Sequence, residues 1–105
     1  MEWLEPWWHV AAERPDLAAT YEWEMRAELG SGHPLFVVPV AAVGKHDGSD
    51  DLLFRALDGS GRVAVVHLTW SRHQELPPWP ATTFFVGLEA FARLRMRPDH
   101  DEHCG

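Results

Sequence analysis

A tight turn between two strand-like stretches constrains the fold of this chain more than any other feature. Residues 58–61 read Asp-Gly-Ser-Gly, a run of residue types that adopt tight turns readily. Residues 51–57 precede the turn, and residues 62–70, Arg-Val-Ala-Val-Val-His-Leu-Thr-Trp, follow it. Apolar and β-branched side chains dominate the second stretch, as is usual in strands. The pattern predicts an antiparallel hairpin and therefore a sheet at the centre of the fold.

Other segments are expected to complete a domain around this hairpin. A helix is predicted over residues 15–29, where Leu17, Tyr21, Met25 and Leu29 repeat at four-residue spacing and form an apolar stripe. Further elements are expected as strands at 35–43 and 82–86 and as helices at 6–12 and 88–96.

Prolines limit these elements. Pro39 cannot donate a ladder hydrogen bond, so residues 35–43 are expected at an edge or a bulge. Pro98 is expected to end the last helix. The predicted fold class is α+β, a three- to four-stranded, mostly antiparallel sheet with an N-terminal and a C-terminal helix. Residues 1–98 are expected to form one domain, and residues 99–105 a flexible polar tail.

Alternation along residues 62–70 sorts the side chains onto two faces of the sheet. Ala64, Val66, Leu68 and Trp70 share one face, and this face is the expected core. Val63 and Val65 lie on the other face, which is too apolar to stay open to water. We expect either the N-terminal segment or a second copy of the chain to cover it.

Charge argues against one class of partner. The 105 residues carry a formal net charge of −7, and residues 1–30 hold seven acidic but only two basic side chains. Such a surface repels the phosphate backbone, so no nucleic-acid partner is expected.

Cysteine content and hydropathy indicate a cytoplasmic protein. Cys104 is the single cysteine, so no disulfide can form within the chain. No signal peptide is recognised in the first residues. The longest apolar run covers residues 35–43, too few to span a bilayer, so no membrane partner is expected.

One polar cluster could bind a ligand. His67 and Thr69 are expected side by side at the end of a strand, with Ser71 and His73 in the following loop. An imidazole beside hydroxyl groups could bind an oxyanion or transfer a proton. The alternative is a histidine that hydrogen-bonds within the sheet or to the proline-rich loop, because no orienting base is evident. No catalytic residues are therefore assigned.

Metal and cofactor sites are not expected. Residues 100–104 read His-Asp-Glu-His-Cys, but the sequence has no second cluster of ligand residues that could complete a metal site with them. Asp47, Asp50 and Asp51 lack the spacing of a calcium loop and suit a solvated connection. No metal and no cofactor is predicted.

Tryptophan is frequent, with six in 105 residues. Tryptophan favours both cores and interfaces. Trp70 is expected in the core and Trp79 against the proline-rich loop. The candidates for an interface are Trp3, Trp7, Trp8 and Trp23.

A resemblance accompanies these patterns. Residues 59–71, which contain His-Leu-Thr-Trp, and residues 78–82, Pro-Trp-Pro-Ala-Thr, resemble a family of small bacterial proteins with no assigned activity. Residues 13–17 and 32–35 are similar as well. The resemblance implies a bacterial single-domain protein and no catalytic or binding residues.

Two functions of different classes remain. The tryptophan content and the lack of a catalytic motif favour a non-catalytic binding or regulatory module that acts through protein–protein contacts, with a protein partner or as a homodimer. The alternative is a small enzyme or ligand-binding domain centred on His67 and Thr69. A deep pocket at His67 would favour the second reading, and a flat apolar patch the first.

Overall fold

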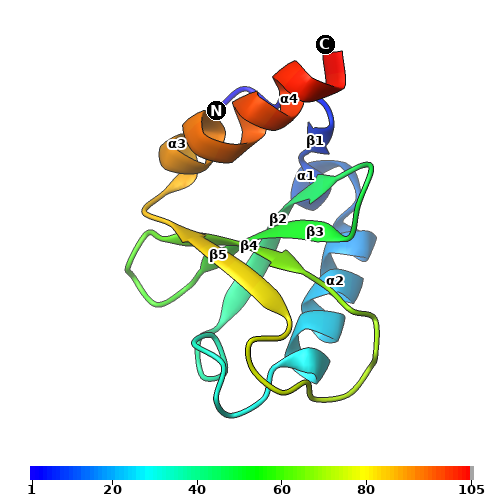
Figure 1. Ribbon diagram of the computed structural model, residues 1–105, viewed down its shortest axis with the longest axis vertical. Helices are drawn as coiled ribbons and strands as arrows, with labels where there is room; N and C mark the ends of the chain where they lie inside the picture. The colour runs from blue at the N-terminus through cyan, green and yellow to red at the C-terminus, as the bar shows by residue number, and fades with distance from the viewer. Residues whose placement is uncertain (105) are drawn as a thin grey trace.

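A computed structural model describes residues 1–104 as helices around one sheet (Figure 1). In chain order the elements are β1 Trp7–Trp8, α1 Val10–Glu13, α2 Pro15–Glu28, β2 Val40–His46, β3 Asp51–Ala56, β4 Val63–His67, β5 Ala81–Phe85, α3 Leu88–Phe91, the π-helical turn η1 Ala92–Met96 and α4 Arg97–Cys104. The α+β class is confirmed. The predicted count of three to four strands is wrong, because the sheet has five.

The sheet is a simple meander. Its strands lie in the order β1-β2-β3-β4-β5, and each neighbouring pair is antiparallel. The predicted hairpin is formed by β3 and β4, with Asp51 opposite His67. Gly59 and Gly61 both have positive φ angles, of 84° and 77°, which explains why this turn uses glycine.

Both faces of the central strands are buried. On one face α2 packs over the sheet, and the shared core includes Met25, Phe54 and Val66. On the other face Val63 and Val65 join a second cluster. That cluster also holds Trp7, Leu53, Phe91 and Met96, which come from the N-terminal segment, β3 and the C-terminal helices. The expected core on the Val66 face is therefore joined by a second buried cluster on the Val65 face.

The strand that the sequence did not predict is β1, and it replaces part of the helix predicted over residues 6–12. Trp7 and Trp8 pair with His46 and Lys45, and the helix begins only at Val10. Aromatic residues favour strands, and pairing with β2 buries Trp7 almost completely. The N-terminal segment thus covers part of the second face, which is one of the two ways of covering it that we expected.

The predicted strand over residues 35–43 is displaced toward the C-terminus. β2 begins at Val40, while successive turns occupy the residues before it: the Phe36 N–H donates to His33 O and the Val38 N–H to Leu35 O. His33 is buried and fixes this segment, since its Nδ1 accepts from the Leu35 N–H at 3.0 Å. Local turns therefore outweigh the strand propensity of this apolar run.

The C-terminal helix continues past Pro98, contrary to expectation. The π-helical turn ends with the Arg97 N–H bonded to Ala92 O, and α4 then starts. Pro98 thereby falls in the first turn of α4, where a missing N–H costs little.

Residues expected to form a flexible tail are helical through Cys104 and contact the N-terminal segment: the Trp7 indole donates to Asp99 at 2.8 Å, and His100 Nδ1 lies 2.7 Å from Glu5 O. In Figure 1 both ends of the chain lie at the same end of the molecule.

No helix within residues 1–104 is both long enough and apolar enough to cross a membrane.

Candidate functional site

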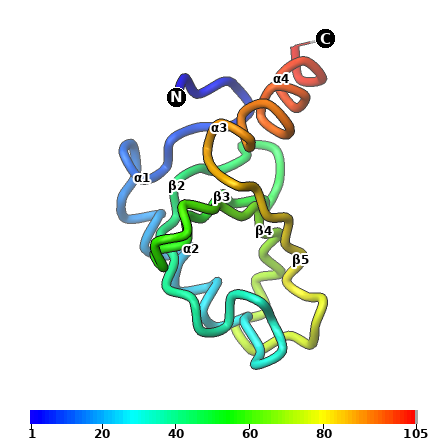
Figure 2. The backbone as a smooth tube through the Cα atoms, turned by 90° about the vertical axis from the view of Figure 1, so that its left-hand side faces the viewer, coloured from blue at the N-terminus to red at the C-terminus, as the bar shows by residue number. Residues whose placement is uncertain are grey.

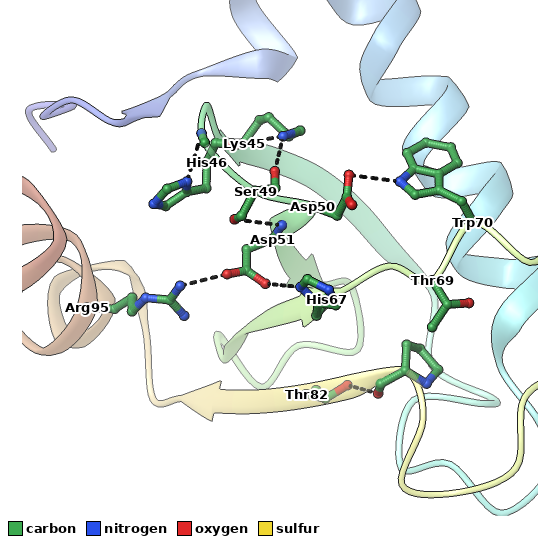
Figure 3. A network of polar contacts seen from close by, with 12 residues as sticks. Lys45, His46, Ser49, Asp50, Asp51, His67, Thr69, Trp70, Thr82 and Arg95 are labelled. Carbon is green, nitrogen blue, oxygen red and sulfur yellow. Dashed lines mark hydrogen bonds and ion pairs between the residues drawn. The ribbon is translucent and has the colours of Figure 1, made fainter. Parts of the chain in front are cut away.

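His67 ends β4 and belongs to a network of ion pairs (Figure 3). Its Nδ1 lies 2.8 Å from Asp51 Oδ1, while Arg95 donates to the other oxygen of Asp51, also at 2.8 Å. Burial acts to raise the pKa of Asp51, but the hydrogen bonds from Arg95 and His67 outweigh burial and hold that pKa below its ordinary value. An ionised carboxylate can only accept, so the Nδ1 N–H of His67 donates to Asp51.

The same network ties the C-terminal helix to the sheet. Arg95 Nε donates to Asp99 at 2.8 Å, and Asp99 also accepts the bond from the Trp7 indole. The guanidinium of Arg95 lies over the Trp7 ring, 5.5 Å from its centre. The contact of His67 with Asp51 thus belongs to a network that joins elements of the fold.

His67 does not line any of the five cavities described for residues 1–104. Five surface cavities of residues 1–104 have volumes of about 290 to 610 Å³, and none of these five is lined by the predicted ligand-binding residues His67, Thr69, Ser71 and His73. The His67 imidazole is half exposed on an open surface. The five cavities therefore give no support for a substrate site at His67.

The other three predicted residues form a separate loop. Thr69 Oγ1 donates to Glu75 at 3.0 Å, and Ser71 Oγ donates to the His73 carbonyl at 3.0 Å. His73 Nδ1 lies 3.1 Å from the Gln74 carbonyl. These polar groups satisfy one another within the loop, so the structure does not combine them with His67.

Sequence reasoning missed two carboxylates that hold this loop. Glu28 is fully buried on α2, and its two oxygens accept the backbone N–H groups of Thr69 and Trp70 at 2.8 and 2.9 Å. Glu24, one turn earlier and also buried, accepts the Arg72 N–H at 3.0 Å. Burial, and next the adjacent Glu24 carboxyl, raise the pKa of Glu28 to about 7.

The loop adopts unusual backbone angles to reach these carboxylates. Trp70 and Arg72 have positive φ angles of 58° and 63°, which turn successive N–H groups inward to form an anion-binding concavity. Glu24 and Glu28 fill it from within the protein. The available sequence signal was their spacing, since they flank Met25 and Leu29 on the apolar side of α2.

The predicted interface tryptophans do not form one surface. Trp7 is buried, while Trp3 packs beside it in the second core. Trp8 packs against the first core, on the opposite side of the sheet. Trp23 is 74% exposed on α2. Trp70 was expected in the core but lies at the surface, because the chain leaves the strand direction after Leu68.

An open sheet edge is the better candidate. The Ala56 N–H donates to Arg62 O and the Leu68 N–H to Asp50 O. Hydrogen-bonded and non-bonded pairs alternate along an antiparallel ladder, so these two bonds identify which residues of β3 and β4 bond to each other. The N–H and C=O groups of Ala64 and Val66 therefore face β3, and those of Val63, Val65 and His67 face β5.

The same alternation continues into β5. Its bonded residues are Phe85, Thr83 and Ala81, so the backbone groups of Thr82 and Phe84 point away from the sheet. Figure 2 shows β5 at the margin of the sheet with no strand beyond it. Residues 81–86 contain no charged residue. Phe84 is 37% exposed and Val86 86% exposed, so the edge is apolar as well as unpaired.

No three His, Cys, Asp or Glu side chains among residues 1–104 are arranged to hold a metal ion. No protein-family model matches the chain, and neither a curated protein nor a solved structure is significantly similar to it. The geometry alone therefore supports the functional proposal.

Proposed function

We propose that this protein is a small non-catalytic interaction module that binds an extended protein segment along the outer edge of β5. The observation that carries the proposal is the unpaired row of backbone groups at Thr82 and Phe84. Natural sheets usually protect such edges with charged residues, proline or a covering element. Residues 81–86 have neither a charge nor a proline, so this edge is available for strand addition.

The chemistry of the edge describes the segment that would fit. Backbone bonds to Thr82 and Phe84 require an extended chain, and they provide affinity without demanding a particular sequence. The exposed side chains of Phe84 and Val86 favour apolar or aromatic neighbours on the same face.

Further points support this reading over the alternatives. The enzyme alternative at His67 and Thr69 loses support because their polar groups bond to separate parts of the fold. The acidic balance argues against a nucleic-acid partner. A single cysteine is consistent with the cytoplasmic location that we propose.

A displayed library of random peptides, selected on the immobilised protein, tests the proposal. Selected peptides should be extended and apolar, and their binding should be measured by fluorescence anisotropy. Phe84→Pro removes an outward N–H but no bond to β4, so it should abolish binding without unfolding the protein. Phe84→Ala keeps the N–H and should bind more weakly than the wild type but better than Phe84→Pro.

Trp23→Ala is the matched control, because Trp23 is exposed on α2, on a different part of the molecule. Circular dichroism establishes that each variant is folded. Peptides that bind Phe84→Pro as tightly as the wild type would show that β5 is not the binding edge.

A further inference from the structure

We infer that the segment taken up at this edge is β5 of a second copy, so that two chains join in one continuous antiparallel sheet about a two-fold axis. This inference rests on the proposed function, since it names the occupant of the same edge.

The opposite edge of the sheet is protected, which singles out β5. There β1 has only two residues. The neighbouring part of β2 has its Ala42 N–H bonded to Glu22 of α2 at 2.9 Å. On β5, His33 Nε2 lies 3.0 Å from the Thr82 hydroxyl, whereas the backbone groups of Thr82 and Phe84 point away from β4. The chain therefore caps one edge and leaves the other ready to pair.

The pattern of β5 is complementary to itself in one register. Only outward-facing residues can form bonded pairs, so Thr82, Phe84 and Val86 must pair among themselves. Placing Phe84 opposite Phe84 of the second copy brings Thr82 opposite Val86 on both sides of the axis. If β5 is extended by one residue to Val86, three bonded pairs form across the interface, each with two backbone bonds.

The neighbouring register is poorer. Centring the axis on Thr83 would place Pro80 opposite Val86 of the other copy. Pro80 has no N–H, and its carbonyl already accepts from Thr82 Oγ1 at 2.9 Å and lies 3.1 Å from His33 Nε2. A pair at Pro80 would thus lack the two bonds that the Phe84-centred register supplies.

The preferred register also buries the exposed apolar side chains. Phe84 and Val86 lie on one face of the strand, and the axis brings both Phe84 rings side by side with Thr82 and Val86 flanking them. The Arg62 guanidinium lies 4.7 Å from the centre of the Phe84 ring and covers part of it within each chain. Pairing removes a further part of this apolar surface from water.

Charge distribution permits two copies of an acidic chain to meet here. Much of the negative charge lies in residues 1–30, and α2 makes contacts with β2, which β3 and β4 separate from β5. The paired strands themselves are uncharged, so the most acidic regions remain apart in the dimer.

Sedimentation equilibrium over a range of protein concentrations is the first test. We expect a monomer–dimer equilibrium for the full chain and for Trp23→Ala. Phe84→Pro removes one bond from each copy and should raise the dimer Kd by roughly tenfold or more. A wild-type chain that is monomeric at every concentration overturns the inference, as does a dimer that Phe84→Pro leaves unchanged.

Cysteine cross-linking tests the register. In a Cys104→Ser background, Phe84→Cys should form a disulfide-linked dimer, because bonded pairs have Cα atoms about 5.5 Å apart, within disulfide range. Thr83→Cys should not, because its own counterpart lies two residues along the strand, roughly 8 Å away. Cross-linking through Thr83 alone overturns this register.

The peptide selection separates the two proposals. If the chain is monomeric but selected peptides bind the wild type and not Phe84→Pro, the second-copy inference fails and the interaction edge stands. If neither the chain nor any peptide uses β5, both fail.

Discussion

Glu28→Ala should destabilise the protein more than any other change of a charged residue on α2. Glu28 is fully buried, and its two oxygens accept the N–H groups of Thr69 and Trp70. Alanine leaves both donors without an acceptor, at a place where the backbone already adopts a positive φ angle at Trp70. The loop that follows β4 should therefore lose its attachment to the helix.

The size of the effect follows from these two bonds. Each buried donor left unsatisfied costs about 1–3 kcal/mol, or about 2–6 kcal/mol for the pair. Water that enters the vacated space and the relief of repulsion from Glu24 offset part of this cost. A net loss of about 2–4 kcal/mol is expected, a large share of the roughly 5–15 kcal/mol that stabilises a small domain. The melting temperature should fall by roughly 10–25 °C.

Urea unfolding followed by circular dichroism, together with thermal melts, measures this loss. Glu13→Ala provides the control, because Glu13 is an exposed acid on the neighbouring helix α1 and should change stability by no more than about 0.5 kcal/mol. Glu28→Gln keeps the shape but presents an amide N–H to one backbone N–H. Its loss of unfolding free energy should therefore fall between those of Glu13→Ala and Glu28→Ala. If the stability of Glu28→Ala lies within about 0.5 kcal/mol of the wild type, these two bonds do not hold the loop to α2.

Three further outcomes are expected. Because the pKa of Glu28 is about 7 when folded and the ordinary value is 4.5, the folded state retains a proton that the unfolded chain releases. The free energy of unfolding should therefore decrease as pH rises from about 4.5 to 7, and Glu28→Gln should flatten this slope in urea titrations at several pH values. Trp7→Phe should cost about 1–3 kcal/mol in urea melts, since it removes a bond to a carboxylate, whereas Trp23→Phe should be nearly neutral; equal effects would contradict the burial assigned to them. Val65→Ala and Val66→Ala should each cost about 1–3 kcal/mol, because both faces of β4 are covered, and a neutral result at either position would mean that its face is open to water.

The parts of the fold that the sequence predicted well depend on local patterns. The turn over residues 58–61 and the apolar strands beside it predicted the β3–β4 hairpin, and the stripe through Tyr21 and Met25 predicted α2. In these cases the residues that determine the element are neighbours in the chain, so periodicity and turn chemistry suffice.

Other parts depend on distant contacts and were missed. β1 is too short for any period to reveal it and forms because Trp7 pairs with His46 across 39 positions of sequence. The predicted helix stop at Pro98 followed a sound local rule, but the π-helical turn places that proline where the rule does not apply.

The candidate site was the least predictable part. Alternation placed Trp70 in the core. The chain leaves the strand direction before Trp70, however, and the Trp70 N–H bonds to Glu28 of α2. The openness of β5 could not be predicted either, because an edge is defined by which strands are neighbours and not by the strand's own residues.

The contact between Trp7 and Asp99 has a consequence for synthesis on the ribosome. These residues are 92 positions apart, so Trp7 leaves the ribosome long before its partner exists. At about 5–20 residues per second, the second core stays incomplete for roughly 5–20 seconds, with an aromatic side chain exposed. The first core needs nothing beyond Leu68, so it can assemble earlier. The first core can therefore form before the second during synthesis. The exposed apolar face of the incomplete second core is the surface that a chaperone would bind.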